Sequence, residues 1–182
     1  MKSVLLKREL AWRENRQGTR HKLPHDVQSW VYESGSLTQR LRDAYGEAVV
    51  VELLRQQWSK PFISEQQLLQ QPENRYCLSR EVLLKAHDTP LILARTLIPS
   101  ATIKAANSNL AQLGTRPLGE ILFAHPQLAR LAMDIVLVTP SQWQTAIAKT
   151  IPIQHPVWGR RTVYALKHKA LLVCEFFLST AF

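Results

Sequence analysis

The sequence predicts an α+β domain in which short helices pack on a largely antiparallel sheet. Two pairs of apolar, β-branched segments are each joined by a short polar turn, which is typical of β-hairpins. Segments with helical spacing lie between these pairs. The chain of 182 residues has no internal repeat, low-complexity stretch or linker, and it is long enough for one domain that encloses a small cavity.

The first half of the chain is expected to begin with two short helices and to continue into strands. Pro24 and Asp26 are suited to open the first helix, and Ser34 and Gly35 break the chain after it. The second helix has leucines at helical spacing between a serine that can cap it and a glycine that can end it. The expected elements are helices over 26–33 and 36–46, a strand over 47–58, a short helix over 64–71 opened by a Ser64 and Gln67 capping box, and strands over 75–86 and 91–98.

The second half is expected to repeat this mixture and to end in a hairpin. Pro117 is suited to the first position of a helix, and Ser141 with Gln144 again has the spacing of a capping box. A short polar segment over 167–169 separates the last two apolar runs. The expected elements are a helical or irregular stretch over 100–113, a helix over 117–124, a strand over 128–138, an amphipathic helix through Trp143, Ile147 and Ile151, and strands over 157–167 and 170–178.

The charge distribution argues against a nucleic-acid binding protein. The formal net charge is +9, and residues 1–24 hold seven Lys or Arg against two Glu, which is more than half of the excess. The rest of the chain shows no basic helix stripe, no basic and aromatic interleaving, and no zinc-finger or helix-turn-helix pattern. We therefore expect a flexible basic leader over 1–24, a single domain over 25–182 and no nucleic-acid partner.

The composition is typical of a soluble cytoplasmic protein. No apolar run approaches the length of a membrane span, so stable membrane insertion is not expected. The first residues lack the apolar core of a secretory signal. The two cysteines, Cys77 and Cys174, lie in apolar strand-like runs, which favours reduced core thiols over a disulfide or a metal site.

Familiar catalytic and cofactor motifs are missing from the sequence. It has no GxSxG, Walker or GxGxxG motif, and its six glycines are scattered. His21 and His25 are four residues apart, as zinc ligands on a helix would be, but Pro24 lies between them in a segment expected to be irregular. We expect neither a metal nor an organic cofactor.

Three charged residues inside predicted strands are the candidates for chemistry. Side chains alternate between the two faces of a strand, so Arg80 shares its face with the apolar Leu78 and Val82. Arg95 lies in a run that is apolar on both faces, and Glu175 is a carboxylate in an equally apolar run. An unpaired charge in such a place costs several kcal/mol, so each of the three needs a partner.

Two interpretations of this trio are open. In the structural one, Glu175 forms an internal ion pair with one arginine, and the other arginine reaches the surface. In the functional one, two guanidinium groups and one carboxylate carry a net positive charge. The carboxylate of a ligand would neutralise this charge through paired hydrogen bonds. The residues by themselves then indicate a cavity for a small, anionic, partly apolar molecule.

From about Trp30 to the C-terminus, the sequence resembles the chorismate pyruvate-lyase family. The similar segments, in order, are SGSLTQRL at 34–41, ENRYCLSREVLL at 73–84, ARTLIP at 94–99, LGTRPLGEILF at 113–123, WGRR at 158–161 and LLVCEFFL at 171–178. No single motif is decisive; their order and spacing make the resemblance specific. It implies a carbon-oxygen lyase that eliminates pyruvate from chorismate to leave 4-hydroxybenzoate, the first step toward ubiquinone, with no cofactor.

The resemblance also implies roles for individual residues. The family's ligand-binding positions fall on Arg80, Leu118 and Glu175, with Leu37 as a fourth, and the arginine of the ART segment is Arg95. Arg80 would hold the ring carboxylate of chorismate and Arg95 the enolpyruvyl carboxylate. The backbone around Leu37 and Leu118 would supply orienting amides, and Glu175 would act at the hydroxyl end as a general acid or base or as a hydrogen-bond anchor.

The helix expected over 36–46 is the best candidate for a lid. It carries Leu37 and is bounded by Gly35 and Gly46, where backbone rotation is easy, and an enclosed ligand needs a moving element to reach its cavity. The short helices are thus expected to cover the sheet and to form lids over a buried ligand cavity.

A second kind of function stays open at this point. The resemblance in fold extends to effector-binding domains of some bacterial transcription regulators, so the alternative is a non-catalytic sensor or binding protein for a small aromatic carboxylate. The basic leader has no clear counterpart in the family, and the stretch over 133–156 is longer than is usual there. The chain is expected to act as a monomer with chorismate and 4-hydroxybenzoate as its small-molecule partners.

Overall fold

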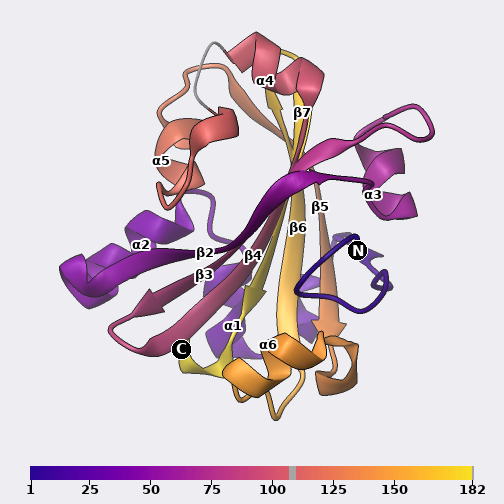
Figure 1. Ribbon diagram of the computed structural model, residues 1–182. Helices are drawn as coiled ribbons and strands as arrows, with labels where there is room; N and C mark the ends of the chain where they lie inside the picture. Colours follow the sequence, from indigo (N-terminus) through magenta and orange to yellow (C-terminus); the bar gives the residue numbers. More distant parts are fainter. Residues whose placement is uncertain (107–109, 182) are drawn as a thin grey trace.

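One antiparallel sheet organises the computed structural model, which describes residues 1–106 and 110–181. The strand order is β1-β5-β6-β7-β4-β3-β2, so the two hairpins predicted from the sequence lie side by side in the centre (Figure 1). The α+β class with a largely antiparallel sheet is confirmed. The strands are β1 (Arg13–Glu14), β2 (Val49–Ser59), β3 (Cys77–Ala86), β4 (Thr89–Pro99), β5 (Leu128–Val138), β6 (Val157–Leu166) and β7 (Lys169–Phe177).

The turns of the two hairpins explain where their strands begin. Lys167 and His168 have φ angles of 47° and 62°, the left-handed conformation at both central positions that matches the twist of the flanking strands. In the other hairpin β4 begins at Thr89, two residues before the predicted start. It includes Pro90, which is tolerated because the register shifts at the opposite Lys85.

Side-chain alternation divides the sheet into two faces. The first face carries Arg80, Ala94 and Glu175, and the second carries Glu81 and Arg95. Figure 1 shows α2 and α5 on one side of the sheet, with α3 and the N-terminal segment on the other. The helices that pack on the first face are α1 (His25–Val31), α2 (Leu37–Tyr45), α4 (Ser100–Ala106) and α5 (Leu118–Phe123), and those on the second are α3 (Ile63–Leu68) and α6 (Thr145–Thr150).

The N-terminal segment is part of the domain. Leu5, Leu6 and Leu10 are buried in the core of the second face, where Leu6 also forms a β-bridge with Trp143. The expectation of a flexible leader over 1–24 is therefore wrong. Basic residues interrupt this stretch, but its leucines cover apolar surface that the sheet would otherwise expose to water.

Two helix starts also differ from the prediction. The helix α3 begins at Ile63, and the Glu65 carboxylate accepts a 2.8 Å hydrogen bond from the Phe62 amide, so Ser64 is not the cap. Gln142 Oε1 accepts a bond of 2.8 Å from the Thr139 amide and closes a single 3₁₀ turn. As a result α6 begins only at Thr145, beyond the predicted cap.

Candidate active site

A cavity lies between the first face of the sheet and the starts of α2 and α5, and the roughly 600 Å³ of space inside it includes its opening to solvent. A mostly apolar lining with a few polar groups is typical of small-molecule sites. The apolar lining includes Val51, Val82, Leu84, Ile92, Ala94, Leu122, Phe123 and Val173, and the polar lining consists of Ser36, Thr38, Arg80, Thr96, Tyr164 and Glu175.

Two helix starts form one wall of this cavity. Leu37 is the first residue of α2 and Leu118 the first of α5, and both line the cavity. The first amides of a helix have no partner within it, so hydrogen-bond donors gather at this wall. A Cβ at Gly119 would lie 2.5 Å from Ser36 Oγ, so any other residue there would force the Ser36 side chain to move.

Arg80 brings an uncompensated positive charge into the cavity. Its side chain is buried, and its Nη2 donates to the Gly114 and Arg116 carbonyls at 3.0 and 2.9 Å. Among residues 1–106 and 110–181 no carboxylate forms an ion pair with it. Burial lowers the pKa of Arg80 to about 10, so the group is still protonated at neutral pH. A desolvated cation without a counterion favours an anionic ligand.

Glu175 faces the same cavity from β7, and its ion pair partner is Arg160. The Arg160 Nε donates to Glu175 Oε2 at 2.6 Å, and 15% of the Glu175 side chain is exposed. The ion pair expected for Glu175 therefore exists, but with an arginine of β6 and not with Arg80 or Arg95. Burial alone would lower the pKa of Arg160, but the Glu175 carboxylate, together with Tyr164 and Glu33, raises it above its ordinary value.

Tyr164 and Thr162 add hydroxyl groups near Glu175. Tyr164 lines the cavity, and its hydroxyl accepts a 3.2 Å bond from Arg130 Nη2. Burial raises the pKa of Tyr164, and the charge of Glu175 adds to this effect. Thr162 lies between Arg160 and Tyr164 on the same face of β6, fully buried, and its Oγ1 has no hydrogen-bond partner in the described part of the chain.

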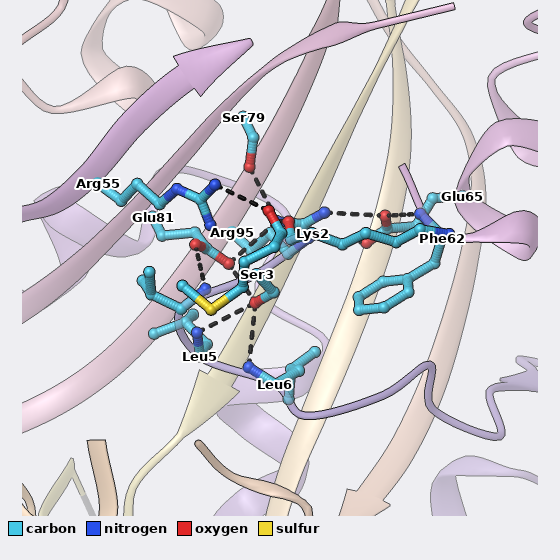
Figure 2. A network of polar contacts seen from close by, with 12 residues as sticks. Lys2, Ser3, Leu5, Leu6, Arg55, Phe62, Glu65, Ser79, Glu81 and Arg95 are labelled. Atoms are coloured by element: carbon cyan, nitrogen blue, oxygen red, sulfur yellow. Dashed lines mark hydrogen bonds and ion pairs between the residues drawn. The ribbon is translucent and has the colours of Figure 1, made fainter. Parts of the chain in front are cut away.

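Arg95 lies on the second face and does not line the cavity. Figure 2 shows its guanidinium enclosed by Glu65, Glu81 and Ser79. It bonds to Glu65 at 2.9 and 3.1 Å, to Glu81 at 3.0 Å, to Ser79 at 2.8 Å and to the Lys2 carbonyl at 3.0 Å. The assignment of Arg95 to a substrate carboxylate is therefore wrong, because strand alternation turns it away from Arg80.

The network around Arg95 also holds the N-terminal segment. Glu81 Oε2 accepts from the Val4 amide at 2.8 Å, and its Oε1 accepts from the Ser3 hydroxyl. Burial alone would lower the pKa of Arg95, but Glu65 and Glu81 together raise it above its ordinary value. These groups bind one another through hydrogen bonds and ion pairs inside the protein, so we assign the network to stability.

The sequence did not single out Arg160, although a signal was present. Arg160 and Arg161 are consecutive in a strand, so one must point to each face. Arg161 on the second face bonds to Asp134 at 2.7 Å and to Ser64 Oγ at 2.7 Å. Its neighbour therefore had to lie on the first face, where Glu175 was the unpaired carboxylate.

Metal ligands do not cluster in the described residues, where no group of three or more His, Cys, Asp or Glu could hold an ion. Cys77 and Cys174 are buried and free, and burial raises the pKa of Cys77 to about 11, so this thiol stays protonated at neutral pH. None of the helices within the described ranges is long and apolar enough to cross a membrane.

The fold and the cavity together define a small α+β protein with a mostly apolar cavity that holds one buried arginine and one carboxylate in its described lining. The chain matches the family described as "Chorismate lyase" over residues 6–182. It is 43% identical over 152 residues to "Probable chorismate pyruvate-lyase" of Methylococcus capsulatus, which covers 84% of this chain and 94% of that protein. The protein of the same description from Methylobacillus flagellatus is 33% identical over 92% of both chains. The chain therefore belongs to the chorismate lyase family, and it is a carbon-oxygen lyase.

Solved structures with the same fold come from transcription regulators. The effector domain of PhnF from Mycobacterium smegmatis superposes with a TM-score of 0.57 at 13% identity, covering 80% of this chain and 89% of that one. The C-terminal domain of the histidine utilization repressor from Pseudomonas syringae pv. tomato gives 0.54 at 8% identity, covering 74% and 94%. At such identities the likeness shows the fold alone.

Proposed function

We propose that this chain eliminates pyruvate from chorismate to leave 4-hydroxybenzoate, as the first step toward ubiquinone. In this proposal it acts in the cytoplasm as a monomer and needs neither a metal nor an organic cofactor. Membership of the chorismate lyase family supports the reaction. The observation that carries the site assignment is a buried guanidinium, that of Arg80, which lines an apolar cavity without a carboxylate partner in the described residues.

The positions of Arg80 and Glu175 suit a ring with polar groups at its two ends. Arg80 is paired with Thr96 of β4 and Glu175 with Ala94 of β4, so they lie on the two strands that flank β4. Two strand spacings across and two residues along the sheet place their Cα atoms roughly 12 Å apart. With both side chains reaching into the cavity, one substituted six-membered ring fits between them.

We assign the ring carboxylate of chorismate to Arg80. A guanidinium binds a carboxylate through two parallel hydrogen bonds, and the carboxylate neutralises the unpaired positive charge of Arg80. The amides at the starts of α2 and α5, beside Leu37 and Leu118, supply further donors at the cavity wall. This arrangement holds the substrate in one orientation before any bond breaks.

Glu175 is assigned to the hydroxyl end of the substrate. Its Oε2 already accepts a hydrogen bond from Arg160, which favours the carboxylate form and makes it an acceptor for the carbinol hydroxyl. In the elimination the ether bond to the ring breaks, and the neighbouring carbinol carbon loses its hydrogen. The departing three-carbon unit gains one proton and leaves as pyruvate, while the ring becomes aromatic and keeps the hydroxyl.

Because Arg95 lies on the second face, the described lining of the cavity offers one buried cation and not the two expected from the sequence. The enolpyruvyl carboxylate is therefore not held by a second buried arginine of the described lining. This carboxylate is present in chorismate and absent from 4-hydroxybenzoate, so the groups that bind the product strongly are those that remain, Arg80 and Glu175.

The test is incubation of the purified protein with chorismate, followed by chromatographic separation of the products. We expect equal amounts of 4-hydroxybenzoate and pyruvate, with the full rate retained after treatment with EDTA. Tight binding of 4-hydroxybenzoate without any turnover of chorismate would contradict the proposal and favour the sensor. A rate lost with EDTA and restored by a divalent ion would contradict the cofactor-free part alone.

A further inference from the structure

Arg160 lies beside the cavity as a buried charge, and its one side-chain hydrogen-bond partner among the described residues is Glu175. Its side chain is about 1% exposed. It touches three parts of the chain at once: Glu175 of β7, the Val31 carbonyl at the end of α1, and the Glu33 carbonyl that precedes α2. The bond lengths are 2.6, 2.9 and 2.6 Å in that order.

We propose that Arg160 is a positioning residue that fixes the Glu175 carboxylate so that its other oxygen selects ligands with a hydroxyl opposite their carboxylate. This inference rests on the proposed function, because it assumes that the cavity binds a hydroxylated aromatic carboxylate. It adds a specificity-determining role for a residue that need not touch the ligand.

The geometry gives the reason for this role. A glutamate side chain has several rotatable bonds, and a free one would lose conformational entropy each time it bound a ligand. Arg160 Nε holds Oε2, and no side chain or amide of the described part of the chain donates to Oε1. The guanidinium is itself held on the opposite side by two backbone carbonyls, so the carboxylate is oriented before the ligand arrives.

The charges support the same conclusion. Arg160 and Glu175 neutralise one another, so the excess positive charge of the cavity stays at Arg80. A ligand is then held by its negative charge at the Arg80 end and by a neutral donor at the Glu175 end. Without Arg160, the Glu175 carboxylate would be an unbalanced negative charge in the cavity and would oppose any anionic ligand.

Arg161 offers a matched control on the neighbouring position. It is also buried, also belongs to β6, and also has one carboxylate partner, Asp134 at 2.7 Å, but it lies on the second face. Removing it disturbs a comparable ion pair without touching Glu175.

The experiment compares the binding of 4-hydroxybenzoate and benzoate, which differ only in the hydroxyl, by isothermal titration calorimetry. A hydrogen bond to a charged group should give the wild type a preference of roughly tenfold to a hundredfold for 4-hydroxybenzoate. Arg160→Met should reduce this preference to about twofold or less, with Arg160→Lys in between because lysine keeps the charge but not the planar fork. Arg161→Met should keep the wild-type preference.

A second pair of variants covers the case in which Arg160→Met does not fold. Glu175→Gln keeps an acceptor oxygen and should retain part of the preference, and the double variant with Arg160→Met, which contains no unpaired carboxylate, should lose it. Equal preference in these two proteins, or wild-type preference in Arg160→Met, would overturn the positioning role while the proposed function stands. Failure of the wild-type protein to bind either ligand would overturn both.

Discussion

Replacing Arg95 with methionine separates a stabilising arginine from a ligand-binding one. Arg95 makes hydrogen bonds to Glu65, Glu81, Ser79 and the Lys2 carbonyl on the second face, and its side chain is fully buried. Arg95→Met would leave two carboxylates inside the protein without their cation. Breaking a buried ion pair in this way costs about 3–5 kcal/mol. In a protein of this length each kcal/mol shifts the melting temperature by about 2–4 °C, so we expect a fall of roughly 6–20 °C.

The matched variant is Arg80→Met, on the neighbouring strand and the opposite face. It removes a desolvated cation that has no carboxylate partner in the described residues, so its stability should stay within about 1 kcal/mol of the wild type. Thermal unfolding followed by circular dichroism gives the stability, and calorimetric titration with 4-hydroxybenzoate well below the melting temperature gives the affinity. Arg95→Met should bind within about twofold of the wild type, whereas Arg80→Met should lose binding. An Arg95→Met protein with wild-type stability and no binding would refute the placement of Arg95.

Three further predictions concern ligand binding and turnover. Arg80→Lys should raise the Kd for 4-hydroxybenzoate by about tenfold or more, because lysine cannot form the paired hydrogen bonds of a guanidinium; an unchanged Kd in a titration would show that charge alone suffices. Glu175→Ala should lower kcat by roughly 10² to 10⁴, since positioned proton-handling groups contribute that much, and wild-type kinetics would leave Glu175 a purely structural partner. Rapid mixing of excess chorismate with enzyme should give a burst near one equivalent of product and then a slower steady rate. The reason is that the product lies beneath α2 and α5 and keeps its contacts with Arg80 and Glu175, so its release is slow. A single linear phase with weak product inhibition would indicate an open site.

Much of the sheet could be predicted because its signals are local. The apolar runs and turn residues placed β5 over 128–138 and placed both hairpins to within a few residues. The starts of α3 and α6 were misplaced because residues next to the predicted caps form the capping bonds instead: Glu65 accepts from the Phe62 amide, and Gln142 accepts from the Thr139 amide and closes an earlier turn. For α3 the tertiary contact between Glu65 and Arg95 also contributes, and no local pattern contains it.

The site was predictable to the extent that strand alternation assigns a face. Alternation put Arg80 and Glu175 on apolar faces, and the structure brings both into one cavity with Leu37 and Leu118. For Arg95 alternation was ambiguous, because both faces of β4 are apolar and each one is covered. Its partner Glu65 lies in a helix thirty residues earlier, and its contact with Lys2 required the N-terminal segment to fold onto the sheet.

The N-terminal segment shows why composition misled the prediction. Its charge suggested a mobile leader, yet Leu5, Leu6 and Leu10 are buried and Ser3 and Val4 bind Glu81. The basic side chains can remain in water while the leucines pack inward, so the net charge of a segment does not decide whether it is ordered.

The most direct test of the central claim is a crystal structure with bound 4-hydroxybenzoate. We expect the ligand in the cavity between the first face and α2 and α5, with its carboxylate within hydrogen-bond distance of Arg80. Its hydroxyl should donate to Glu175, whose carboxylate should still be bound by Arg160. A ligand found at another surface, or seated in this cavity with its carboxylate turned away from Arg80, would contradict the account.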